Sequence, residues 1–289
     1  VSSAEFDHDI DTSNTNDGYP LLYNHSLSDV TILPAEDYRT TYGHVICGWC
    51  DNITYSNLFL AGDGLGLYRV TNANITNVSV NTTTGYVLNL QQSTDNTFSD
   101  LKLNTTTGTF MMINQYSHRN NFSNSRFLMP TICRGMVTYY SDYNRLHNVT
   151  IDLDVGWGDA VYLIESDHFW IEDSSLKADT GIGGSYTNVY NVTVIDTYIE
   201  IDSYQASFES NINNGNMVLR NVTSDEPWAI DVQGSGTVNI TIEEYVDVNV
   251  TNTSAVTLAN ARVVTTDKDG NQLTTQSRTS AGLIRSNVT

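Results

Sequence analysis

Three aspartates lie close together in the stretch NVTIDLDVGWGD, which ends at Asp159. Two carboxylates held at a suitable separation can act as acid and base in the cleavage of a glycosidic bond. The candidates for such a pair are Asp159 and, further along the chain, Glu172 and Asp173. Because Asp and Glu are common in this chain, such neighbours also arise by chance. We expect the nearby His147 and His168 at the surface or at a coil edge rather than as general bases.

The same aspartates also fit a structural interpretation. Asn and Asp suit sharp corners, because they tolerate left-handed backbone angles and hydrogen-bond their own main chain. Equivalent positions of a parallel stack lie about 4.8 Å apart, so a column of carboxylates must be solvated, partly protonated or bridged by a cation. We favour a corner column over a catalytic pair, with calcium as a candidate ligand because it accepts several oxygen atoms in flexible geometry. The members of the predicted column are Asp154, Asp179, Asp202 and Asp225, with Asn81 and Asn104 in earlier coils.

Short strand-like segments recur through the middle of the chain with a nearly constant period. About eight units of roughly 22 to 26 residues share one layout. Each has an alternating strand such as NVTIDLD, an Asn, Asp or Gly corner, and a second apolar strand such as AVYLI or GTFMMI. Helical periodicity is missing over any useful length, and a β-sandwich would lack the constant period. Because stacked coils can share a continuous core, we predict an all-β parallel β-helix, or solenoid, over residues 46–235.

The N-terminal segment does not follow the repeat. Residues 1–45 are expected to cap the first coil, which would otherwise expose an unpaired edge. Within this segment Asp7, Asp9 and Asp11 alternate in a pattern that can fold round calcium. The Gly and Glu of an EF-hand loop are lacking, so a solvated tail is the alternative.

The C-terminal segment, residues 236–289, also departs from the repeat. Thr and Val alternate on both sides of Lys268-Asp269-Gly270-Asn271, which is typical of a hairpin turn. We predict a small antiparallel β module or a closing cap. The pattern A-x-V-x-x-x-D-x-D-G in this segment resembles the small carboxypeptidase-regulatory-like β-sandwich repeats of extracellular proteins.

Length, composition and charge exclude several classes of partner. The chain has 289 residues, of which 39% are hydrophobic and 16% charged, so it can bury a core and is not disordered throughout. Its formal net charge of −20 repels nucleic acid and anionic lipid and suits salty or cation-rich surroundings. No hydrophobic run approaches the roughly 18 to 20 residues that a membrane-spanning helix needs.

N-x-S/T sequons are dense in this sequence. Their density favours a secreted glycoprotein whose leader has been removed, at the cell surface or in the cell wall. The candidate glycosylation sites are Asn52, Asn74, Asn81, Asn104, Asn148, Asn191, Asn221 and Asn239.

The three cysteines are Cys47 and Cys50, in a C-x-x-C motif, and the isolated Cys133. A thioredoxin-like site would need a βαβ context and a zinc site a second pair of ligands, and the sequence shows neither. An odd number of cysteines in a secreted chain leaves one for pairing between molecules. The preferred prediction is a bridge from Cys133 to Cys47 or Cys50, with the remaining thiol joining two subunits. A local bond and unpaired thiols are the alternatives.

Around WGDAVYLIESDHFWIEDSSL the chain resembles the pectin-lyase-like right-handed β-helix superfamily, which includes polygalacturonases, pectate lyases, NosD-like proteins and phage tailspikes. The resemblance covers roughly residues 46–235 and concerns the coil pattern more than any motif. Polygalacturonases would have two adjacent aspartates where this chain has Gly158 and Asp159. Pectate lyases would have Trp-Ile-Asp-His, whereas Glu172 and Asp173 follow the Trp-Ile here. Neither catalytic pattern is complete.

These features together predict a structural role. A rigid, acidic solenoid with an odd cysteine resembles the archaeal surface-layer and sheath proteins that carry NosD-like β-helix domains. We predict a non-catalytic, self-assembling cell-envelope subunit whose main partner is a second copy of itself. One alternative is a β-helix enzyme that degrades polysaccharide. The other is a glycan-binding adhesin or tailspike-like module, because some of the 17 tyrosines could form a row of exposed rings that stacks sugars.

Overall fold

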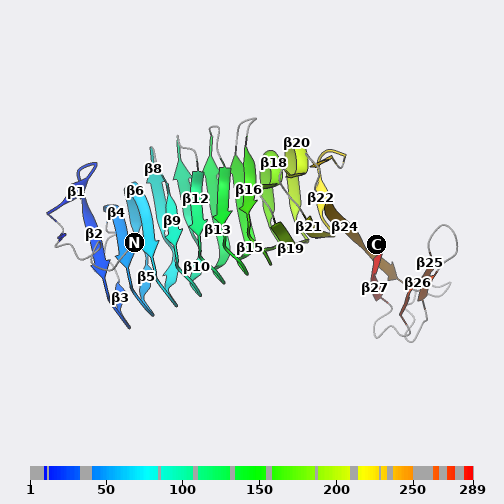
Figure 1. The fold of residues 1–289 in the computed structure, drawn as a ribbon, viewed down its shortest axis with the longest axis horizontal. Coiled ribbons are helices and arrows are strands. Elements are labelled where there is room, and N and C mark those ends of the chain that lie inside the picture. Colours follow the sequence, from blue (N-terminus) through cyan, green and yellow to red (C-terminus); the bar gives the residue numbers. More distant parts are fainter. Residues whose placement is uncertain are drawn as a thin grey trace.

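The computed structural model describes residues 10–11, 13–32, 41–83, 86–106, 110–130, 134–153, 158–185, 188–208, 214–227, 229–232, 237–249, 263–266, 272–276 and 283–288. These residues form an all-β structure whose main body is a parallel β-solenoid of about 8 turns. Figure 1 shows the coils stacked side by side along one axis. The predicted fold class is therefore confirmed. No helix that could cross a membrane occurs in the described part of the chain.

Three parallel ladders run along the solenoid, and we call them A, B and C. Ladder A contains β2 (Tyr19–His25), the later part of β4 (Thr41–Gly48), the second half of β6 (Phe59–Tyr68), β9 (Leu88–Gln91), β12 (Phe110–Gln115), β14 (Arg134–Tyr139), β16 (Asp159–Ile164), the second halves of β18 (Ser175–Ser185) and β20 (Tyr198–Phe208), and β23 (Ile230–Val232).

Ladder B contains β3 (Thr31–Ile32), β5 (Thr54–Ser56), β7 (Asn74–Thr76), β10 (Thr97–Ser99), the first halves of β13 (Asn121–Met129) and β15 (Arg145–Leu153), β17 (Trp170–Glu172), β19 (Asn188–Ile195), β21 (Asn214–Arg220) and β24 (Thr237–Asn249). Ladder C contains the start of β4, the first half of β6, β8 (Ser79–Thr82), β11 (Lys102–Thr105), the second halves of β13 and β15, the first halves of β18 and β20, and β22 (Thr223–Ser224).

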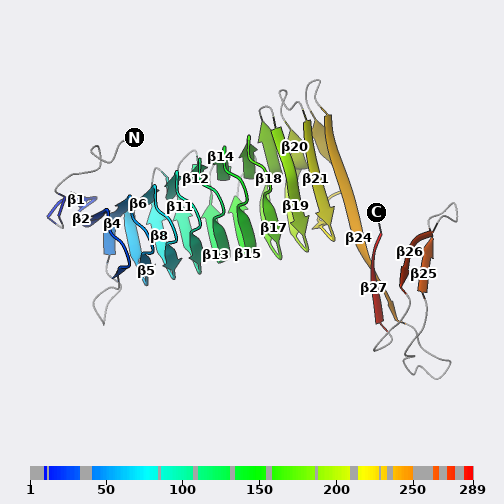
Figure 2. The same cartoon turned by 60° about the horizontal axis from the view of Figure 1, so that its bottom comes forward.

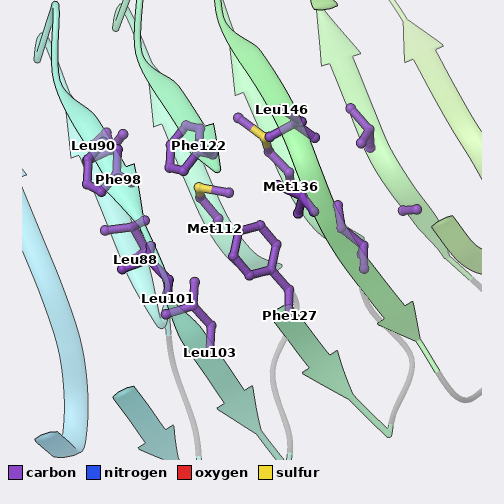
Figure 3. Close-up of a cluster of buried hydrophobic side chains, with 14 of the residues drawn as sticks. Leu88, Leu90, Phe98, Leu101, Leu103, Met112, Phe122, Phe127, Met136 and Leu146 are labelled. Atoms are coloured by element: carbon purple, nitrogen blue, oxygen red, sulfur yellow. The ribbon is translucent and has the colours of Figure 1, made fainter. Parts of the chain in front are cut away.

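The core lies between the three ladders and is built by alternation along each strand. In β15, for example, Leu146, Val149, Ile151 and Leu153 are buried, while their neighbours face outward. Equivalent apolar side chains of successive coils lie in register, as the view in Figure 3 shows. Phe98 and Phe122 are stacked with ring centroids 4.6 Å apart. Burying each such side chain contributes roughly 1.5–3 kcal/mol, which is the main reason that the coils stack.

Buried polar side chains form two further columns at the turns between ladders A and B. The hydroxyls of Ser93, Ser117, Ser141 and Ser166 each accept the backbone N–H of the equivalent residue in the preceding coil. Asn96, Asn120 and Asn144 do the same with their side-chain oxygens, and their amides donate to backbone carbonyls of an earlier coil. All of these side chains are buried. Each turn is therefore hydrogen-bonded to the next, which fixes the spacing of the coils.

The turns contain residues in the left-handed conformation at regular intervals. At the turn from ladder B to ladder C this residue is always Asn or Asp, as expected from their tolerance of positive φ. This corner column consists of Asn57, Asn77, Asp100, Asn124, Asn148, Asp173, Asp196 and Asn221. Neighbours hydrogen-bond along it, for example Asn148 Nδ2 to Asn124 Oδ1 at 2.8 Å. The predicted kind of corner exists, but it is formed by other residues than the predicted ones.

The predicted column of Asn81, Asn104 and the four aspartates is not continuous in register. Asn104 pairs with Asn81, as predicted, but the next residues in that column are Leu128 and Asp152 rather than Asp154. The shift arises because successive coils differ in length by one or two residues. A search for equal spacing does not detect such differences.

The register also changes at the C-terminal end of the predicted column. Asp179 lies at a register shift between β18 and β20 and accepts a hydrogen bond from Ser203 Oγ at 2.5 Å. Ser224 pairs with Ile199, so that Asp225 follows in line with Glu200 rather than with Asp202.

The ends of the solenoid differ from the predicted boundaries. The first coil begins before residue 46, because β2 and β3 already pair in parallel with β4 and β5. β1 (Thr15–Asn16) is antiparallel to β2 and lies over this coil. At the other end β24 pairs in parallel with β21 over Thr237–Glu243 and antiparallel with β27 (Leu283–Val288) over Glu244–Asn249.

β25 (Val263–Thr266) and β26 (Gln272–Gln276) form an antiparallel pair, which supports the predicted hairpin. The residues of the predicted turn lie outside the described part of the chain. Figure 2 shows these strands beyond the end of the solenoid, with β24 leading to them.

Candidate functional site

Ladder B has an outward face on which two columns of side chains follow the axis. In the N-terminal coils these side chains are small and polar, as expected on a flat, solvated sheet. In the coils of β15 and β17 the columns change abruptly to large side chains. The first column is Thr54, Asn74, Thr97, Asn121, Arg145, Trp170 and Thr193, and the second is Ser56, Thr76, Ser99, Ser123, His147, Glu172 and Ile195.

A groove of about 690 Å³ lies at this change of side-chain size. It extends over three coils, from β15 across β17 to β19. The lining residues are Tyr143, Asn144 and Arg145 from the first coil, His168, Trp170 and Glu172 from the second, and Asn191 and Thr193 from the third.

One wall of the groove is aromatic. Tyr143 and His168 occupy equivalent corner positions, and their rings are stacked with centroids 4.4 Å apart. Tyr143 is 56% exposed and Trp170 42% exposed, so both present ring surface to solvent. The buried Asn144 anchors this corner, because its amide donates to the carbonyls of Ser117 and Ser141 at 3.0 Å each.

The other wall is polar. The guanidinium of Arg145 donates to Glu172 Oε2, so these two side chains form an ion pair across adjacent coils. The Nδ1 atom of His147 lies 3.8 Å from Glu172 Oε2 and 3.5 Å from Asp173 Oδ2. Of these side chains Arg145 and Glu172 line the groove, so planar groups with several donors and acceptors face it on this side.

A hydrogen-bonded column of titratable side chains includes Asp142 and Asp167, which directly precede Tyr143 and His168 in the chain. The N–H of Asp142 donates to His118 Nδ1 at 3.0 Å, and the N–H of Asp167 donates to Asp142 Oδ1 at 2.8 Å. The N–H of Tyr190 donates to Asp167 Oδ1 at 2.9 Å. Burial raises the pKa of Asp167, the Tyr190 N–H lowers it, and the charge of Asp142 raises it again. The net result is an Asp167 pKa above its ordinary value.

The three carboxylates considered as catalytic lie on two different ladders. Asp159 begins β16 in ladder A, where its Oδ2 accepts a hydrogen bond from Arg134 Nε at 2.9 Å. The Arg134 guanidinium also lies 3.4 Å above the centre of the Tyr162 ring. Glu172 and Asp173 lie at the end of β17 in ladder B, beside His147. Register therefore groups Glu172 and Asp173 but places Asp159 in another ladder.

Calcium stays a prediction at both proposed places. Among the described residues no group of three or more His, Cys, Asp or Glu side chains is placed to hold a metal ion. Asp154, Asp7 and Asp9 lie outside the described residues. Asp11, which is described, accepts hydrogen bonds from Ser13, and these lower its pKa.

The preferred disulfide prediction is wrong. Cys47 and Cys50 are bonded to each other, and both are buried. The bond closes the short turn that leads from β4 to the next ladder, where Arg69 lies 5.2 Å over the Trp49 ring. A local bond was the alternative prediction. Its geometry is accessible because the two cysteines are three residues apart at one corner. Cys133 lies outside the described residues.

The candidate glycosylation sites all lie at the surface. None of Asn52, Asn74, Asn81, Asn104, Asn148, Asn191, Asn221 and Asn239 is buried. Their occupancy stays a prediction.

Sequence reasoning missed Arg145 and the role of Trp170. The signal was available, because a large residue interrupts a column of Thr, Ser and Asn at each of these positions. It can be used only once the register is known, since an error of one residue moves a side chain to the other face.

The fold and the groove define a parallel β-solenoid with one mixed aromatic and polar site on its ladder B face. No protein-family model, curated protein or solved structure matches the chain.

Proposed function

We propose that this chain is a structural subunit of an extracellular assembly, such as a surface layer, sheath or filament. The observation that supports this most directly is the construction of the solenoid as a rod. The apolar core and the buried serine and asparagine columns run from coil to coil, so the coils cannot slide or separate independently. A rod of this kind is better suited to bearing load than a mobile loop is.

The C-terminal end of the rod offers strand edges for assembly. β22 pairs with β20, and no strand of the described residues pairs on its far side. Unpaired edges accept strands from a neighbouring molecule, which is a common route to polymers. β24 continues from ladder B into its pairing with β27, so the C-terminal strands are joined to the rod by an unbroken strand.

The sequence features support an extracellular location. The surface sequons, the scarcity of lysine and the net charge of −20 fit a secreted protein in salty surroundings. The resemblance to NosD-like β-helix domains of archaeal envelope proteins fits the same proposal.

The cysteine arrangement changes how an assembly would be held together. With Cys47 and Cys50 bonded to each other, Cys133 is the only other cysteine of the chain. One thiol per chain can link two copies but cannot build a continuous network. We therefore propose non-covalent contacts as the main force in the assembly, with a Cys133 bridge contributing dimers at most.

Negative-stain electron microscopy of the purified protein, over a range of concentrations and with and without reductant, tests this proposal. We expect ordered sheets, tubes or fibres that persist in reductant. A Cys133→Ser variant is the matched control and should assemble in the same way, while losing any dimer seen on a non-reducing gel. Discrete monomers under all conditions, confirmed by sedimentation, would contradict the proposal.

A further inference from the structure

We propose that the groove across β15, β17 and β19 binds a short neutral glycan, as a binding site separate from any self-assembly contact. The first argument is its position. Along the described outward columns of ladder B, small polar side chains are replaced by Arg145, His147, Trp170 and Glu172 within two adjacent coils. Solubility alone does not require this change from small polar side chains to large ones.

The second argument is the exposed ring surface. Trp170 and the Tyr143–His168 stack lie within one groove, although burial of such rings is favourable. Rings that stay exposed beside polar groups suit a ligand that has apolar C–H faces as well as polar groups. The faces of a pyranose ring combine the two in this way.

The backbone supports the same conclusion. Tyr143 and His168 have φ angles of 61° and 55°. In earlier coils this corner position is held by Asp29, Asn52, Asn72 and Asp95, which tolerate such angles, and by Arg119 in the coil directly before Tyr143. A bulky tyrosine is strained at such an angle, whereas a histidine tolerates it better. The backbone strain at Tyr143 is therefore kept at the place where its ring and that of His168 form the wall of the groove.

The third argument is charge, which selects the kind of glycan. Arg145 is the only Lys or Arg among the lining residues given above, and Glu172 neutralises it. Asp173 lies next to Glu172, and the chain as a whole carries a net charge of −20. A uronate, sulfate or phosphate group would therefore meet repulsion without an available cation. The pectin-like polyuronates that the superfamily resemblance implies do not fit, whereas neutral sugars do.

The dimensions fit a short segment of such a glycan. Three coils at about 4.8 Å each give a groove about 10 Å long between its outer coils. Trp170 lies in the middle coil, with Arg145 and Thr193 on either side of it in the register. In this arrangement a sugar ring stacks on Trp170, and its hydroxyls reach Arg145, Glu172 and Asn191.

Binding can be measured by isothermal titration and tryptophan fluorescence on the dispersed protein. The probes are neutral tri- and tetrasaccharides of glucose, mannose, galactose and N-acetylglucosamine, with oligogalacturonates of equal length beside them. We expect at least one neutral series to bind at millimolar concentrations or below, and the oligogalacturonates to bind more weakly or not at all.

Three variants locate the site. Trp170→Ala and Tyr143→Ala should each weaken binding by about tenfold or more. Tyr116→Ala is the matched control, because Tyr116 is also an exposed tyrosine in a stacked pair, with Tyr140, but does not line the groove. Its affinity should be unchanged. Thermal unfolding checks each variant, and the highly exposed Tyr143 keeps the test valid if Trp170→Ala does not fold.

Three results would overturn the proposal. They are the absence of binding by every neutral probe, tighter binding of oligogalacturonates, and equal affinity of the wild type and both groove variants. None of these depends on whether the chain assembles, so failure here is distinguishable from failure of the structural proposal.

Discussion

At the scale of single residues, the same chemical group has different consequences in different coils. Asp95 is held by Arg119 through hydrogen bonds of 2.6 and 2.7 Å, and these lower the pKa of Asp95. At Asp167 burial raises the pKa, and the opposing effects of the Tyr190 N–H and of His168 do not cancel this rise. The two aspartates therefore affect stability in opposite directions at neutral pH, although both lie in turns between ladders A and B.

An Asp167→Asn substitution should stabilise the protein at pH 7 by a few tenths of a kcal/mol, since Asp167 is partly exposed. Asn keeps an oxygen that can accept the Tyr190 N–H but removes the buried charge and its repulsion with Asp142. The folded-state pKa of Asp167 is raised, so the native state takes up the proton first as pH falls. The gain should therefore shrink as pH falls through that raised pKa toward the ordinary value of 3.8.

Asp95→Asn is the matched control with the opposite sign. The folded-state pKa of Asp95 is lowered, so its contribution is present above the ordinary pKa and lost as pH falls through the lowered one. Chemical denaturation of both variants between pH 3 and pH 8 measures the two trends. Parallel pH profiles for the two variants would show that this account of the charges is wrong.

At the scale of elements, the buried polar columns matter as much as the apolar core. A turn between two strands leaves backbone N–H and C=O groups without partners in its own coil. In this protein the next coil supplies the partner through a serine or asparagine side chain. The turns are thereby tied to a fixed coil spacing, and the aromatic corner of the groove lies directly on this support.

Asn120→Ala should lower the free energy of unfolding by about 2–4 kcal/mol. Asn120 Oδ1 accepts hydrogen bonds from the backbone N–H of Asn96 at 3.1 Å and from Asn96 Nδ2 at 3.0 Å. Asn120 Nδ2 donates to Ser93 O at 2.9 Å. The substitution leaves these buried groups unpaired. Urea unfolding measures the loss.

The matched control is Asn74→Ala, because Asn74 is an exposed asparagine on β7 in the same ladder region. It should change stability by less than about 0.5 kcal/mol. Equal effects of the two substitutions would mean that the buried asparagine column does not stabilise the turns.

At the scale of the whole molecule, charge opposes the proposed assembly. Each copy carries a formal charge of −20, and side-by-side rods repel one another. Salt screens this repulsion, with a screening length of about 10 Å at 0.1 M and about 3 Å at 1 M.

Assembly should therefore increase steeply when NaCl is raised from about 0.1 to 1 M. Light scattering and sedimentation of the protein at fixed concentration measure this effect. A second series with calcium at constant ionic strength separates screening from cation bridging. If high salt instead disperses the particles, opposite charges rather than apolar or strand contacts hold the assembly together.

The amino-acid sequence alone determined the architecture of this protein. A period of about 22 to 26 residues, with alternating apolar positions and Asn or Asp corners, is sufficient for a solenoid because each coil must bury the same face on the next. It also indicated the antiparallel C-terminal strands, since the alternation there continues without corners.

Only the tertiary structure decided the register, and with it the site. Coils differ in length by a few residues, so equal spacing placed Asn104 and Asp225 in one column that the register divides, and it could not separate Asp159 from Glu172. A strand side chain changes face with a shift of one residue, so the sequence could not show that Arg145 lies beside Trp170. It also left the pairing of Cys47 open, because a bond between cysteines depends on corner geometry rather than on their number.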